Sequence, residues 1–131
     1  MIQPSLLTTP TAESIHFGTV ADMIAARDEM LRLTNLFETG EEVRDEASLF
    51  RVLAATLRFP DYFGGNWDAV VDCLRDVQAT GARVGLTLVV HHAKVLWRNA
   101  PECAATLIET WLAVAEERRA SNEPFHLVFV W

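Results

Sequence analysis

Apolar residues recur along this chain with two different periods. From Thr19 to about Met30, and from about Asp45 to Arg58, they return every three or four positions, which predicts amphipathic helices. Asp45 is a suitable N-cap for the second helix. The side chains expected to face the core are Val20, Met23, Ile24 and Leu31 from the first region and Leu49, Leu53 and Leu57 from the second.

Other apolar segments are too continuous for a helical period. Residues Leu31 to Phe37 alternate and then become fully apolar, and Gly85 to Val90 and Phe125 to Trp131 are apolar almost throughout. Such runs are typical of strands inside a sheet that helices cover on both faces. Ser14 to Phe17 is a candidate edge strand, so three strands are expected, or four with this segment.

Three more helical segments complete the pattern. One runs from Trp67 to about Gln78, a single turn covers Ala93 to Trp97, and a long helix begins at Pro101 and ends before Ser121. The side chains expected to fill the core in this half are Trp97, Leu107, Trp111, Leu112, Val114 and Trp131.

The order of these elements predicts an α/β fold. Strands separated by helices form parallel sheets through right-handed crossovers. We therefore expect a three-stranded parallel sheet, with an extra N-terminal edge strand as an option, packed with four to five helices. A chain of 131 residues suits one domain. Residues 1–13 are interpreted as a loose tail and residues 14–131 as a single domain, with an N-terminal helical extension at 14–35.

Charge narrows the classes of partner. Eleven basic and eighteen acidic residues leave a net charge of -7, which disfavours nucleic acid and favours a basic protein. The chain shows neither a signal peptide nor a membrane span, so we expect a cytoplasmic monomer that does not bind membranes. Cys73 and Cys103 are too few for a disulfide framework and are expected to be free thiols. No spacing indicates a metal or a cofactor.

The segment from Phe59 to Asp76 carries the strongest local signal. Pro60 ends the preceding helix, and Gly64 and Gly65 permit a sharp turn. Asn66 is a good N-cap, and Asp68 lies where the positive end of a helix dipole favours an anion. A helix is therefore predicted to begin at Trp67.

This predicted helix has one apolar and one acidic side. At 100° per residue, Asp68, Asp72 and Asp76 fall on one row, which we call the acidic row. The opposite stripe consists of Trp67, Val70, Val71, Leu74 and Val77. Like charges at this spacing repel by a few tenths of a kcal/mol per pair, so the row faces either solvent or a cationic partner.

The same segment resembles the barstar family, small bacterial inhibitors of secreted ribonucleases. The resemblance covers roughly Leu36 to Trp131 and implies a barstar-like α/β fold without enzymatic activity. The matching positions are Gly40, Leu49, Leu53, Leu57 and Pro60 upstream, then Tyr62, Gly64, Asn66, Asp68, Ala69, Asp72, Cys73 and Leu74.

The resemblance implies a decoy mechanism in which carboxylates enter the phosphate site of a ribonuclease. Asp72 would be the phosphate mimic, Asp68 would pair with cations at its edge, and Tyr62 would lie on the catalytic histidine. An acid from the last helix, Glu116 or Glu117, would reach the same enzyme. The partner-binding residues implied are Tyr62, Gly64, Asn66, Asp68, Val71, Asp72, Asp76 and Glu116.

Other interpretations remain open at this point. Val71 stands where the family has an aromatic residue, and Arg75 adds a positive charge, so the fold could serve as a non-inhibitory adaptor or immunity protein for another basic partner. An enzyme that uses the two aspartates would need further groups, and no histidine lies near them in sequence. His91 and His92 are interpreted as loop residues.

Overall fold

The structure is a computed structural model that describes residues 13–77 and 85–131. Most of the predicted N-terminal tail and the expected helical residue Gln78 lie outside the described residues. The helices are α1 (Val20–Leu33), α2 (Glu46–Leu57), α3 (Trp67–Asp76), α4 (Ala93–Asn99) and α5 (Pro101–Ala120). The strands are β1 (Ile15–Gly18), β2 (Asn35–Glu38), β3 (Leu86–Val90) and β4 (Phe125–Val130).

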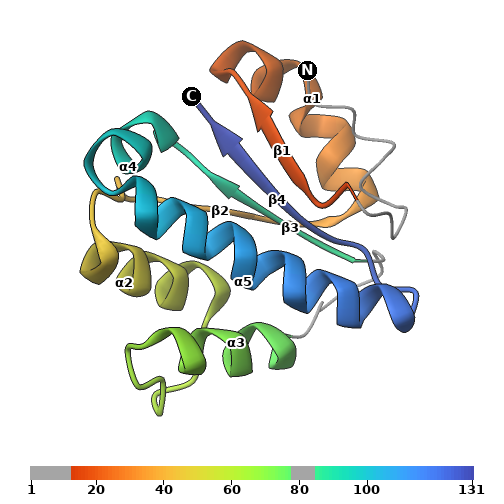
Figure 1. Cartoon of the computed structure of the whole chain (residues 1–131). Helices are drawn as coiled ribbons and strands as arrows, with labels where there is room; N and C mark the ends of the chain where they lie inside the picture. The colour runs from red at the N-terminus through yellow and green to blue at the C-terminus, as the bar shows by residue number, and fades with distance from the viewer. Residues whose placement is uncertain (1–12, 78–84) are drawn as a thin grey trace.

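The four strands form one parallel sheet in the order β1-β4-β3-β2. Leu127 of β4 is paired with Leu88 of β3 on one side and Ile15 of β1 on the other. The α/β class is therefore confirmed, and the optional N-terminal edge strand is present as β1. Figure 1 shows α1 on one face of this sheet and the other helices on the opposite face.

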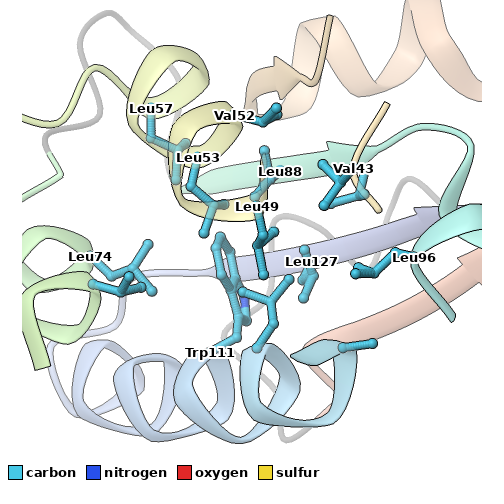
Figure 2. Packing of buried hydrophobic residues seen from close by; sticks show 14 of the residues in the cluster. Val43, Leu49, Val52, Leu53, Leu57, Leu74, Leu88, Leu96, Trp111 and Leu127 are labelled. Atoms are coloured by element: carbon cyan, nitrogen blue, oxygen red, sulfur yellow. The ribbon is translucent and has the colours of Figure 1, made fainter. Parts of the chain in front are cut away.

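The larger core lies between the sheet and helices α2 to α5. Trp111 of α5 is fully buried at its centre, stacks on Phe125 with ring centroids 4.2 Å apart, and donates from Nε1 to the Phe125 carbonyl at 3.2 Å. Figure 2 shows its indole among side chains from α2, α3 and the sheet, including Leu49 and Leu74. Continuous burial of β3 and β4 matches the apolar runs that predicted them.

The smaller core lies under α1 alone. Three buried side chains of this helix, Met23, Ala26 and Met30, pack against the other face of the sheet. The sheet contributes Val89, Val128 and Val130. Thr19 caps α1 through a capping box with Asp22, so the predicted start of this helix is confirmed.

The predicted inner face of α1 was wrong in part. Val20, Ile24 and Leu31 are exposed, with Ile24 at 74%, and only Met23 of the predicted set is buried. Leu31 also belongs to the last turn of α1, so the expected strand over Leu31 to Phe37 begins later, at Asn35. Two helical stripes were compatible with the apolar positions, and the stripe that faces the sheet is the one with Met23, Ala26 and Met30.

Smaller corrections concern the C-terminal half. Trp131 and Leu112 were expected in the core but are 45% and 40% exposed. The single turn predicted at Ala93 is a helix of two turns that reaches Asn99. No helix in the described part of the chain is long and apolar enough to cross a membrane.

Candidate functional site

The loop before α3 fixes where the helix begins. Arg58 ends α2 in the left-handed region at φ 57°, and the amide of Phe63 donates to the Pro60 carbonyl at 2.9 Å, which closes a tight turn. Gly65 has φ 69°, a conformation that glycine adopts without strain. Asn66 Oδ1 then accepts from the Ala69 amide at 2.8 Å. The predicted N-cap is therefore confirmed.

The apolar side of α3 anchors it to the larger core. Val70 and Leu74 are fully buried, and Cys73 is nearly so. Trp67, the first residue of the apolar stripe, is half-buried: its ring lies edge-on to Phe50 at 5.0 Å. Its Nε1 donates to Glu46 Oε2 at 3.1 Å. The helix is thus fixed along its length with the acidic row turned outward.

The acidic row is exposed, as its spacing predicts. Asp68, Asp72 and Asp76 are all exposed, and the Asp72 side chain retains 73% of its accessible surface. Among the described residues, Asp72 forms an ion pair with Arg75, whose Nη1 lies 3.6 Å from Oδ1. Among the described residues, Asp68 and Asp76 form no ion pair. Three carboxylates on a capped helix therefore present a negative surface to solvent.

Arg75 has a stronger partner than the acidic row. Its Nε and Nη2 donate to the two carboxylate oxygens of Glu117 at 2.9 and 2.8 Å, a bidentate pair that joins α3 to α5. The bonds raise the pKa of Arg75 and lower that of Glu117. The side chain of Arg75 is therefore directed toward α5.

The other candidate residues surround this surface. Tyr62 is 75% exposed, and Gly64 and Asn66 are also exposed on the loop that precedes α3. Val71 is half-buried beside Asp72 and packs against the larger core. The loop and the helix adjoin in sequence, and together they carry most of the residues proposed from the sequence.

The two candidate acids of α5 have different partners within the protein. Glu116, the residue chosen from the sequence, pairs with Arg119 of its own helix at 2.5 Å. Glu117 is the residue that contacts α3, through Arg75. The local signal, four consecutive charged residues near the end of a helix, did not distinguish the two. Only their distance from α3 does.

The other titratable groups are not part of the acidic row, and Cys73 lies on the buried side of the same helix. His91 Nε2 lies 2.9 Å from Glu38 Oε1, and Glu38 also pairs with Arg27. Both cysteines are free and buried, and burial raises the pKa of Cys103 to about 11. The described residues contain no group of three or more ligands suited to a metal ion.

Comparison with a solved structure supports the fold alone. A chain from "Structure of Drosophila ORC bound to AT-rich DNA and Cdc6" superimposes with a TM-score of 0.54 at 14% identity. The match covers 96% of this chain and 42% of that chain. At this identity the likeness concerns the α/β architecture only. No curated protein matches the sequence.

Comparison with protein families gives a match in sequence. The model of the family described as Barstar (barnase inhibitor) matches residues 34–130. That range contains β2 to β4, α2 to α5 and the complete acidic row, and it agrees with the resemblance identified from Leu36 onward. The first 33 residues, with β1 and α1, precede the matched region. The chain belongs to the barstar family.

Proposed function

We propose that this protein is a barstar-like inhibitor that binds a ribonuclease and blocks its phosphate-binding active site with the carboxylates of α3. The observation that carries the proposal is the exposed acidic row on a capped helix, within the region matched by the family model. This role requires a binding surface and no catalytic group, so we propose a binding protein and not an enzyme.

Asp72 is the proposed phosphate mimic. Its carboxylate lies near the middle of α3 and is exposed, so a cationic pocket can enclose it. Asp68, one turn earlier, would pair with cations at the edge of that pocket, and Asp76 would remain at the rim. The net charge of -7 would also speed the approach of a basic enzyme.

The loop residues would complete the contact. Tyr62 is a large exposed aromatic side chain, the type that most often dominates binding energy at interfaces. Gly64 would allow close approach of the partner backbone, and Asn66 would keep the loop and helix in register. Val71 would add a small apolar contact beside Asp72. Glu116 remains a predicted contact from α5.

The first experiment is direct binding. Isothermal titration calorimetry would use small secreted ribonucleases, including any encoded beside this gene, together with an assay of RNA cleavage. The proposal predicts a one-to-one complex and loss of cleavage with at least one of them. Absence of both binding and inhibition across the panel would refute the inhibitory role.

Substitutions then test the docking. Asp72→Ala should weaken the complex by about 2 to 5 kcal/mol, the cost of removing one partner of a buried charge pair, whereas Asp76→Ala should act mainly on the association rate. That range comes in part from barnase with barstar, the pair that names this family. Asp72 is exposed in the free protein, so neither change should unfold it. Equal losses for the two variants would contradict the proposed pose.

A second candidate function is an adaptor or immunity protein with a different basic partner. Arg75 favours it, because a guanidinium 3.6 Å from Asp72 reduces the negative charge offered to a phosphate site. Affinity capture from a native lysate, with Asp72→Ala as the matched bait, separates the two functions. A captured nuclease that loses binding to the variant supports inhibition, and a basic protein without nuclease activity supports the adaptor.

A further inference from the structure

The C-terminal end of α3 is held by Arg118, a residue of α5 that lies more than forty positions away in sequence. Its Nη2 lies 3.0 Å from the carbonyl oxygen of Leu74, 3.1 Å from that of Arg75 and 2.6 Å from that of Val77. The last carbonyls of a helix have no partner within the helix. One guanidinium therefore caps the end of the helix that carries the acidic row.

The guanidinium is itself firmly placed. Its carbon lies 4.6 Å from the centroid of the Phe125 ring, and its Nη1 lies 3.3 Å from Glu123 Oε2. The side chain is only 12% exposed. Burial lowers the pKa of Arg118 from its ordinary value, but arginine remains protonated in proteins. Its positive charge therefore stands at the negative end of the α3 dipole, where it is stabilising.

This placement has a cost that a surface arginine would not carry. Arg118 Nε is buried and finds no hydrogen-bond partner among the described residues. A buried donor without a partner is unfavourable. The three carbonyl contacts, the ring contact and the ion pair must together offset that cost, which distinguishes Arg118 from its neighbour Arg119.

The helix needs such support from outside. It has 10 residues, and isolated helices of this length are marginal in water. The acidic row adds repulsion between carboxylates one turn apart, and Asp76 lies at the end where the dipole disfavours an anion. Asn66 satisfies the first turn. The last turn depends on α5.

We propose that Arg118 is a positioning residue for the acidic row: it fixes the last turn of α3 on α5, so that Asp72 is held in one orientation before a partner binds. Its role in partner binding rests on the proposed function, but its role in ordering α3 does not. A helix that is ordered in advance loses less conformational entropy when the complex forms.

Hydrogen exchange of the free protein tests the ordering. In Arg118→Ala, amides in the last turn of α3 should exchange at least about tenfold faster, since bonds to a charged group are lost. The exchange rates of amides in β3 and β4 should change only as far as the global stability changes. Arg119→Ala is the matched control, because Arg119 pairs within its own helix. Unchanged exchange in α3 of Arg118→Ala would overturn the proposal.

Two further variants test the same point in case Arg118→Ala does not fold. Arg118→Lys keeps a charge and donors at the helix end, whereas Arg118→Gln keeps neither the charge nor the reach. We expect slower exchange of the last turn in the lysine variant than in the glutamine variant. Equal exchange in both would show that charge at this position does not order the helix.

A double-mutant cycle tests the link to Asp72 in a complex that the wild type forms. Arg118→Ala should raise the dissociation rate about tenfold in the wild-type background and much less when Asp72 is already alanine, because the two residues then act through one contact. Equal effects in both backgrounds would exclude action through Asp72. If no ribonuclease binds the wild type, the proposed function fails while hydrogen exchange still decides the role of Arg118.

Discussion

The two faces of the sheet differ in how much structure covers them and in what they carry. One face packs against α2, α3, α4 and α5 around Trp111, and this layer lies within residues 34–130, the region of the family match (Figure 1). The other face packs against α1 alone, which precedes that region. The candidate site belongs wholly to the first face. The helix α1 therefore covers the face opposite the acidic row, while the larger layer carries and positions that row.

The largest expected effect is on the larger core. Trp111→Ala removes a fully buried, stacked indole and should lower the free energy of unfolding by about 3 to 5 kcal/mol. It should also weaken any partner complex, since α5 supports α3. Chemical denaturation measures the first effect and calorimetry the second. Trp131→Ala, at a half-exposed tryptophan, is the control and should cost much less.

An intermediate effect is expected on the smaller core. Met30→Ala removes a fully buried side chain of α1 and should lower the free energy of unfolding by about 2 kcal/mol, near the low end for such truncations because one helix can settle onto the sheet. Partner binding at a temperature where the variant is folded should not change. Leu31→Ala, at an exposed neighbour, is the control. Weakened binding in Met30→Ala would show that the two faces are coupled.

The smallest effect concerns the attachment of β1 to the sheet. His16 Nε2 lies 2.9 Å from His126 Nδ1, and burial lowers the pKa of His16 below its ordinary value of 6.5, an effect that Glu13 partly opposes. As pH falls, His16 therefore becomes protonated in the unfolded chain at a higher pH than in the folded chain. The contribution of His16 is complete above about pH 6.5 and is lost as pH falls through its folded pKa.

Urea denaturation between pH 7.5 and 5.5 measures this dependence. The wild type should lose stability toward pH 5.5 more steeply than His16→Gln, in which this proton is absent. His92→Gln, at an exposed histidine, should behave like the wild type. Parallel curves for the wild type and His16→Gln would show that the histidine contact does not contribute to holding β1.

The sequence by itself determined the parallel α/β class, the start of α3 at Trp67 after its N-cap Asn66, and the outward direction of Asp68 and Asp72. These features depend on capping, on periodicity and on continuous apolar runs, all of which act between residues close in the chain. The tertiary structure alone decided which stripe of α1 is buried and that Arg75 pairs with Glu117, 42 positions away. Such pairings depend on how the helices pack on the sheet, and the spacing of residues within one helix carries no information about them.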